Sequence, residues 1–447
     1  MTHFDERSDQ EHDAPLVLLG GEGLGEGTVP PLTPTLMHDP WLTIREPSRL
    51  ADLAASLHAK LEAASARNPN RKPRSDAAER RLAIVQNLVA NLALVALRHP
   101  PGTRLAVQAD KKAATRYDRK DLPRGPLIDT LKSLAEDGLA LYHAAVFKHL
   151  RTTVEPSARL RSMLTQAGAS LEDISCAPGG ETVILKAVVG RNRPKILVDY
   201  ADTGETLRLR AEMRTVNDAL AGADIRLYGE RQPPDQLVRV FLVNGAEAPA
   251  TFDGHGRLFG GFWQSLPRAR RTGLTIGAER LVELDYRAMY VHLAYAHIGA
   301  TLPAGDPYAV AGLEEHRDAV KKAAASLFFR DGTLRRLSGE LRELLPAGWT
   351  AKMLSAAVEA KHPAIAHLLG TNIGPSLANT ESNILVAVLL RLIGQGVVAL
   401  PIHDCVLVAE SAKAAAMAAM REESKRLVGV ALPMEEKAGQ QVAAIGK

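Results

Sequence analysis

The sequence predicts an α+β protein of two or three domains, for three reasons. Its 447 residues exceed what one hydrophobic core usually holds, and a 46% hydrophobic content supports several packed cores. Helical periodicity dominates residues 46–165. Short apolar runs typical of strands, at 182–189, 237–243 and 396–408, begin further along the chain. We therefore expect a mostly helical N-terminal part and a C-terminal part built of sheet and helices.

Composition narrows the protein class. A formal charge of +4 and a pI near 9.0 are compatible with an anionic partner such as nucleic acid. Two cysteines, Cys176 and Cys405, are too few for a disulfide framework or a cysteine zinc site, which favours the cytoplasm. Residues 1–29 lack the pattern of a secretory signal. The apolar segment Leu82–Leu97 has 16 residues, fewer than the roughly 20 of a membrane span, so we expect a buried helix and no membrane partner.

The first element is a predicted disordered acidic tail over residues 1–45. Residues 1–40 contain one arginine and eight acidic residues, together with clustered glycines and prolines. Helical spacing then predicts helices over 47–64 and 75–97, separated by a loop rich in asparagine and proline.

A basic segment follows, in which residues 104–161 contain 12 Lys or Arg against 7 Asp or Glu. A helix over 126–137 and then a β-hairpin with a basic tip are typical of a winged helix, which places a helix in a DNA groove. Candidate DNA contacts are Lys111, Lys112 and Arg116. The alternative is that these charges are the solvated face of a helical domain.

We expect residues 166–250 to form a connecting or thumb-like α/β region. Strands are expected over 182–189, 195–200 and 237–243, with a helix over 208–220. No carboxylate constellation here or earlier suggests a second metal site, so we expect no proofreading exonuclease.

Residues 254–271 combine several glycines with four arginines and the aromatic pair Phe262 and Trp263. Such a segment can bring backbone and guanidinium groups close to phosphates or base edges. The alternative is a glycine-rich surface turn with incidental arginines.

Two carboxylates at strand ends are the candidate catalytic pair. Asp285 ends an apolar run and precedes a predicted helix over 289–298, while His403 and Asp404 lie between two strand-like runs. Such a pair suits two Mg²⁺ ions about 3.5–4 Å apart, with Mn²⁺ as an alternative, acting on a 3′-hydroxyl and a leaving pyrophosphate. The alternatives are that Asp285 caps the following helix or pairs with Arg287.

A third group lies on one predicted helix. Arg317, Lys321 and Phe329 fall within an arc of about 120° at 100° per residue. Two cations there could bind a triphosphate, with the aromatic ring beside the base. A solvated basic face is the alternative.

In this order the motifs resemble family A DNA polymerases, the DNA polymerase I-like enzymes, and partly the single-subunit phage-type RNA polymerases. The resemblance covers roughly residues 250–440 and is carried by Gly256-Arg-Leu, Gln264-Ser-Leu-Pro, Leu284-Asp-Tyr, Arg317-x3-Lys321-x7-Phe329 and Ile402-His-Asp. It implies a right-hand polymerase palm over 251–447, formed by an antiparallel sheet with helices. The fingers would be short, because only 119 residues separate the two aspartates.

The resemblance also implies roles for single residues. Asp285 and Asp404 would bind the metals, and Arg317 and Lys321 would bind the triphosphate. Phe329 would replace the fingers tyrosine, and His403 would lie near the primer terminus. Arg257 and Gln264 would contact primer–template.

The chain departs from the family pattern at several positions. Phe329-Arg330 stands where the family has Tyr-Gly, Ala325 where it has an aromatic residue, and Cys405 where it has glutamate. Tyr290 stands where the DNA enzymes have a glutamate that helps exclude ribose. A bulky ring at that position could still block a 2′-hydroxyl and favours deoxynucleotides.

The resemblance therefore implies a DNA-dependent DNA polymerase without proofreading, acting on a DNA primer–template and dNTPs in the replication of a mobile element or phage. One alternative is a primer-independent RNA polymerase or primase. The other is a catalytically inactive DNA-binding replication protein.

Overall fold

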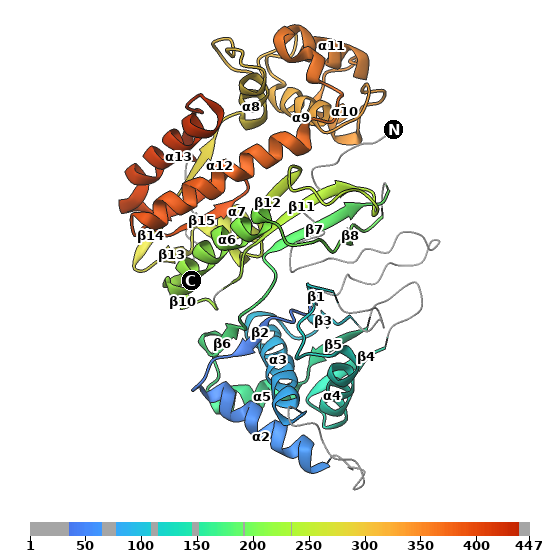
Figure 1. The fold of residues 1–447 in the computed structure, drawn as a ribbon, viewed down its shortest axis with the longest axis vertical. Helices are drawn as coiled ribbons and strands as arrows, with labels where there is room; N and C mark the ends of the chain where they lie inside the picture. The colour runs from blue at the N-terminus through green and yellow to red at the C-terminus, as the bar shows by residue number, and fades with distance from the viewer. Residues whose placement is uncertain are drawn as a thin grey trace. The chain divides into compact units, whose positions relative to one another are not determined.

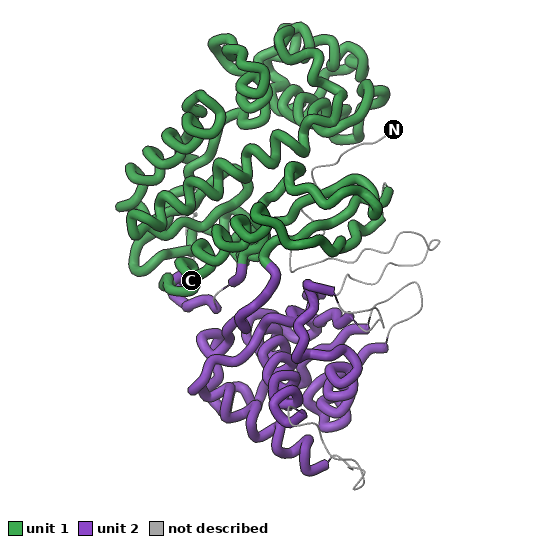
Figure 2. Tube along the Cα trace, viewed as in Figure 1, with its two compact units in different colours: residues 1–10, 182–224, 237–447 green, residues 11–181, 225–236 purple. Residues whose placement is uncertain are grey.

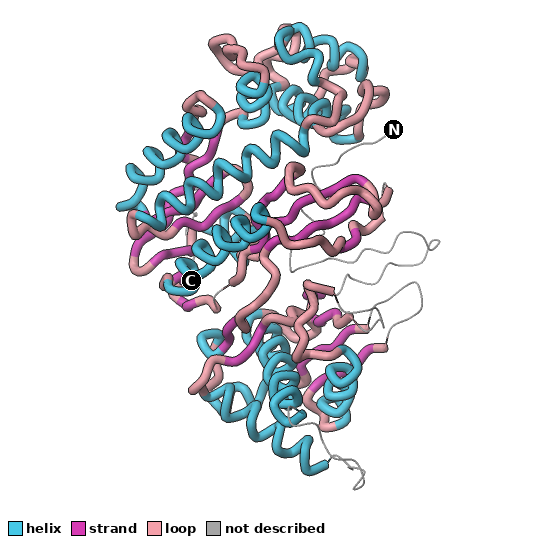
Figure 3. The backbone as a smooth tube through the Cα atoms, in the orientation of Figure 1, coloured by secondary structure: helices cyan, strands magenta, loops and turns pink. Residues whose placement is uncertain are grey.

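The computed structural model describes residues 35–64, 77–108, 115–144, 152–190, 193–233 and 235–437. The chain divides into two compact units, shown in Figure 2. Among the described residues, the N-terminal unit contains those up to 181 together with 225–236, and the C-terminal unit contains 182–224 and 237–437. Each unit mixes helices and strands, as Figure 3 shows, so the α+β class is confirmed.

The N-terminal unit packs helices against small sheets (Figure 1). One sheet has the strand order β1-β3-β5-β4, and β2 pairs with β6 in a second. The elements are β1 (Thr35–Met37), β2 (Leu42–Ile44), α2 (Arg49–Ala64), α3 (Ala77–Arg98), β3 (Arg104–Ala106), α4 (Arg124–Glu136), β4 (Ala140–His143), β5 (Thr153–Pro156), α5 (Ala158–Ala167) and β6 (Ile174–Cys176). Hairpin β9 (Ile225–Leu227) and β10 (Glu230–Arg231) also belongs to this unit.

Helix α3 is the core of this unit, as the apolar run at 82–97 predicted. Its two buried asparagines are fully engaged, because Asn87 donates to the carbonyl oxygens of Asp39 and Leu42 and Asn91 donates to that of Asp39. A buried amide is tolerated only when its hydrogen bonds are made. These bonds fasten the segment that carries β1 and β2 to the helix.

The predicted tail is therefore wrong over residues 35–45, where β1 and β2 form. Strands of three residues give too little periodicity to be recognised in a polar segment. Residues 1–34 lie outside the described part of the chain.

The expected hairpin forms, since β4 and β5 pair antiparallel after α4. Its tip at 145–151 lies outside the described residues, as do Lys111 and Lys112. Arg116 is described and pairs with Glu181 at 3.4 Å. The winged helix and its DNA contacts stay predictions.

The C-terminal unit contains a four-stranded sheet of order β12-β11-β7-β8. Strands β7 and β11 run parallel, and α6 forms the crossover between them. The bounds are β7 (Val183–Val188), β8 (Ile196–Leu197), α6 (Gly204–Gly222), β11 (Val238–Asn244) and β12 (His255–Phe259). Strand β8 is shorter than the predicted 195–200.

A second, antiparallel sheet in this unit follows the order β13-β14-β16-β15, with β17 also paired to β14. Helix α13 packs against β14 and β16, and α12 packs against β12 and β15. The bounds are β13 (Leu274–Ile276), β14 (Glu279–Tyr286), α12 (Gly374–Gly394), β15 (Ala399–Ile402), β16 (Cys405–Ala409), α13 (Lys413–Val428) and β17 (Met434–Glu436).

Between β14 and α12 the chain is helical. It contains α8 (Met289–His297), α9 (Arg317–Phe328), α10 (Gly339–Leu344) and α11 (Ala351–Lys361). In the described residues, α3 and α12 are long and apolar enough to cross a membrane by length and composition. More than half of each apolar window is buried inside the fold, as in core helices of folded domains.

Candidate active site

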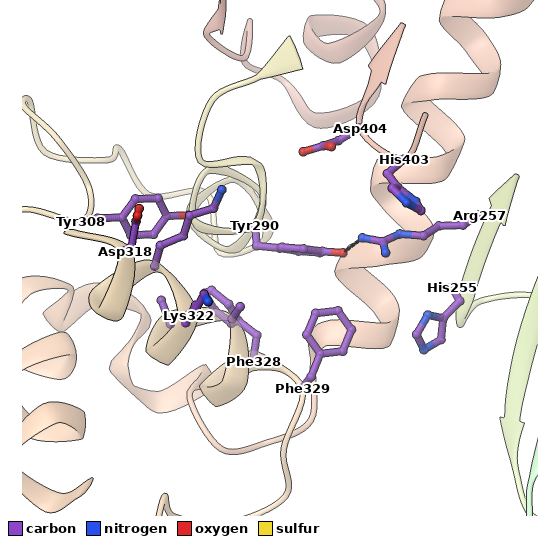
Figure 4. A pocket seen from close by; sticks show the side chains of 13 residues that line it. His255, Arg257, Tyr290, Tyr308, Asp318, Lys322, Phe328, Phe329, His403 and Asp404 are labelled. Carbon is purple, nitrogen blue, oxygen red and sulfur yellow. Dashed lines mark hydrogen bonds between the residues drawn. The ribbon is translucent and has the colours of Figure 1, made fainter. Parts of the chain in front are cut away.

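A cavity of about 470 Å³ lies within the C-terminal unit (Figure 4). It brings together residues from β12, α8, α9 and the β15–β16 turn, segments that are far apart in the sequence. Six of its lining residues are among the candidates selected from the sequence: Arg257, Tyr290, Lys321, Phe329, His403 and Asp404.

Arg257 reaches the cavity from an irregular part of β12. The register of β11 and β12 shifts between Val240 and Phe241, opposite His255 and Gly256, which both have positive φ. Such bulges redirect side chains. Gly256 has φ +81°, and an added Cβ would lie 2.6 Å from the Phe241 ring, so only glycine fits.

The Arg257 guanidinium is held on two sides. Its Nε donates to Glu381 Oε1 at 2.9 Å and its Nη2 to Glu381 Oε2 at 3.3 Å. Nη2 also donates to the hydroxyl of Tyr290, drawn as a dashed line in Figure 4. Arg257, which was predicted to contact primer–template, is thus part of a hydrogen-bonded network at the cavity.

An aromatic wall continues from Tyr290. Its ring meets the ring of Phe329 edge to face, with centroids 5.2 Å apart and an angle of 89° between planes. The His255 ring lies 6.1 Å from Phe329 on its other side. Although Ala325 replaces the aromatic residue of the family's helix, these rings give the cavity an apolar side suited to a sugar or base.

Helix α9 begins at Arg317, and the two cations that were selected from the sequence face different surroundings. Lys321 is exposed, lines the cavity and has no ion-pair partner in the described part of the chain. Arg317 is not a lining residue; it donates to Asp306 at 2.6 Å and lies over the Tyr308 ring at 5.1 Å. Of Arg317 and Lys321, only Lys321 is therefore available to an anion in the cavity.

His403 and Asp404 form the two-residue turn between β15 and β16, where Ile402 pairs with Cys405. His403 has φ +52°, in the left-handed region that suits a tight hairpin. Burial, together with the charges of Arg257, Arg271 and Lys437, lowers the pKa of His403 to about 4. The imidazole is therefore neutral at pH 7.

Asp285 lies next to this turn, because β14 pairs with β16 and Asp285 is opposite Cys405. Burial and the charge of Asp404 raise the pKa of Asp285 to about 6. Burial and the charge of Glu381 raise the pKa of Asp404 to about 6. Burial and a neighbouring carboxylate thus oppose the charged form of both side chains.

Neither alternative for Asp285 is what the structure shows. The residue at the start of α8 is Ala288, without a side-chain cap, and Arg287 pairs with Glu435 at 3.2 Å. Asp285 Oδ2 instead forms an ion pair with Lys437 at the end of β17, and Lys437 also lies 3.6 Å from Glu283.

A divalent cation at the two aspartates stays a prediction, and one carboxylate oxygen favours it. Oδ1 of Asp285 is buried without a hydrogen-bond partner among the described residues, so it has an acceptor to offer. No cluster of three or more His, Cys, Asp or Glu side chains in the described ranges could hold a metal ion. Mg²⁺ commonly binds through one or two carboxylates and completes its shell with water and substrate phosphates.

Gln264 is placed away from the cavity lining. Its amide nitrogen donates to the carbonyl oxygens of Leu258 at 2.9 Å and Pro401 at 3.2 Å. It thereby fastens β12 to β15, and its predicted contact with primer–template stays a prediction.

The residues of the site that were not selected from the sequence include Glu381, Tyr308, His255 and Lys437. Glu381 is a single acidic residue inside an apolar helix pattern, and its partner is 124 residues away. His255 did carry a signal, because it lies between Gly254 and Gly256, where a tight backbone was expected.

No protein-family model matches the chain, and no curated protein sequence matches it. Among solved structures, the chain is similar to the POL domain of Pol1 from M. smegmatis in complex with DNA primer-template and dNTP. The identity is 15%, the TM-score is 0.25, and the match covers 52% of this chain and 50% of that one. The chain thus matches half the length of this distant neighbour, and the function proposed below depends on the chain's own residues.

Proposed function

We propose that the chain is a template-directed nucleotidyltransferase of the DNA polymerase type. The observation that carries the proposal is the gathering of Arg257, Lys321, Phe329 and Asp404 around one cavity, from segments spread over about a third of the chain. Each was selected from the sequence for a separate role: primer–template contact, triphosphate binding, base contact and metal binding. Their gathering in one place is what a polymerase site requires.

The reaction would be attack of a 3′-hydroxyl on the α-phosphate of a nucleotide, with pyrophosphate as the leaving group. Divalent cations held by Asp285 and Asp404 would supply positive charge for the attacking and leaving oxygens. Lys321, exposed at the cavity, would bind the phosphates. Tyr290 and Phe329 would contact the sugar and base.

The size of Tyr290 favours deoxynucleotides. Its ring fills one side of the cavity and is fixed by Phe329 and Arg257. A ring held on two sides cannot easily move away from a 2′-hydroxyl. The primer-independent RNA polymerase or primase is therefore the less favoured alternative.

The test is primer extension with Mg²⁺ and dNTPs on a defined template. Asp404→Asn and Asp285→Asn are expected to lower incorporation by at least about a hundredfold, because they remove charge where the cations bind. The matched control is Glu435→Gln, which neutralises an exposed carboxylate opposite Asp285 on β17. Incorporation that persists in both aspartate variants would refute the mechanism.

Two observations favour the second candidate, a catalytically inactive DNA-binding protein. Lys437 already neutralises Asp285, and Cys405 stands where a further acidic group is expected. Under this alternative the protein binds DNA with steep salt dependence, does not bind Mn²⁺, and incorporates no nucleotide.

The N-terminal unit would bind the DNA on which the reaction occurs. The basic segment, including Arg116, motivates this part of the proposal. Together with the lack of a predicted exonuclease, it favours a role in replicating a mobile element or phage, in the cytoplasm.

A further inference from the structure

Glu381 is a carboxylate in the interior of α12, with 1% of its surface exposed. A buried charge is costly unless it is paired and hydrogen-bonded. Both of its oxygens accept from one guanidinium, that of Arg257, at 2.9 and 3.3 Å. A two-point contact fixes the plane of the guanidinium as well as its position.

Arg257 transmits this constraint to Tyr290. Besides pairing with Glu381, it donates to the tyrosine hydroxyl, and its guanidinium carbon lies 5.9 Å from the ring centroid. Phe329 also restrains the Tyr290 ring, with the two ring centroids 5.2 Å apart. Glu381, Arg257, Tyr290 and Phe329 thus form a chain of contacts from the interior of α12 to the cavity wall, and Figure 4 shows its last three members.

Charge explains why a carboxylate is needed in this position. Burial opposes the positive charge of Arg257, but the charge and hydrogen bonds of Glu381, together with Tyr290 and Asp404, outweigh burial and hold the pKa of Arg257 above its ordinary value. If Glu381 lost its charge, Arg257 would lose its largest attraction and part of the two-point contact that fixes its plane, so its hold on Tyr290 would loosen.

We propose that Glu381 is a positioning residue that sets the preference for deoxyribose over ribose, by holding Arg257 where it fixes the Tyr290 ring. The inference rests on the proposed nucleotidyltransferase function. It assigns to α12 a part in substrate choice, although Glu381 itself is too deeply buried to touch the nucleotide.

The variant that tests it is Glu381→Gln, which keeps the size of the side chain and one acceptor but removes the charge. The matched control is Glu423→Gln on α13. Glu423 is also buried and paired with two arginines, Arg391 and Arg426, but it does not line the cavity.

The main readout is the ratio of kcat/KM for a dNTP over the corresponding rNTP in primer extension. Loss of a charge-assisted contact predicts a fall of about tenfold or more in this ratio for Glu381→Gln. The ratio in Glu423→Gln should equal that of the wild type. A merely structural role would lower both kcat/KM values together and leave their ratio unchanged. Glu381→Asp, which keeps the charge, should recover part of the preference.

A second measurement does not depend on turnover. Competition of dATP and ATP against a fluorescent nucleotide gives the ratio of dissociation constants for the full-length protein. A wild-type preference for dATP that falls in Glu381→Gln supports the inference. A wild-type protein without preference, or a variant with an unchanged ratio, overturns it. Failure of the proposed function is a different result, namely nucleotide binding without primer extension by the wild type.

Discussion

Replacing Asp404 by asparagine should stabilise the C-terminal unit in the absence of metal, although it abolishes the proposed reaction. Burial and the charge of Glu381 raise the pKa of Asp404 from 3.8 to about 6. A shift of this size corresponds to an upper limit of roughly 3 kcal/mol of destabilisation by the ionised form. Removing the charge also relieves Asp285, whose pKa is raised partly by Asp404.

The sign of the pH dependence follows from the direction of the shift. Because the folded state holds the proton more tightly than the unfolded state, wild-type stability falls as pH rises from about 4 through about 6. The extra folding stability of Asp404→Asn over the wild type is therefore fully present above pH 7 and disappears near pH 4. Asp285→Asn should gain less folding stability, because Lys437 would lose its ion pair with Asp285.

The assay is urea unfolding in EDTA, followed by hydrogen exchange of the β14 and β16 amides, at pH 7.5 and pH 5.0. Local exchange is needed because a chain of two units does not unfold in a single step. Added Mn²⁺ should stabilise the wild type but not Asp404→Asn, since ligand binding stabilises only the state that binds it. An Asp404→Asn variant no more stable than the wild type at pH 7.5 would refute the reasoning.

Three further predictions concern the cavity. Gly374→Ala places a Cβ within 2.7 Å of the Phe329 ring and should weaken nucleotide binding severalfold, measured by fluorescence competition; unchanged affinity would contradict it. Lys437→Met removes the ammonium group from Asp285 and should lower the Mn²⁺ dissociation constant, measured by electron paramagnetic resonance, by about tenfold; weaker binding would show that the lysine assists the metal. Tyr290→Ala should bring dNTP and rNTP incorporation closer to equal, and an unchanged preference would exclude a role for the ring.

The sequence predicted the elements of the C-terminal unit better than the contacts between their side chains. Helix α8 (Met289–His297) matches the helix expected over 289–298, and α9 forms where one helix was expected to carry both Arg317 and Lys321. The cavity could be predicted because its candidates belong to ordered motifs. Glu381 could not, since its function depends on a partner in β12 that no local pattern identifies.

Arg317 illustrates a second limit. The helical arc that groups it with Lys321 is correct, but Arg317 is the first residue of α9 and contacts the preceding loop at Asp306 and Tyr308. Periodicity describes the faces of a helix and carries no information about loops at its ends. Lys437 is similar, because it meets Asp285 only through the pairing of β17 with β14.

The turn that carries Asp404 also bears on how this protein can change over evolutionary time. It has two residues, and β16 on its far side is paired with both β15 and β14. One inserted residue would shift that strand by one position and turn every side chain of β16 to the opposite face. Descendants of this sequence can accept insertions in the loop at 299–316 without such a penalty. Between Ile402 and Cys405, we therefore expect insertions and deletions to be rejected.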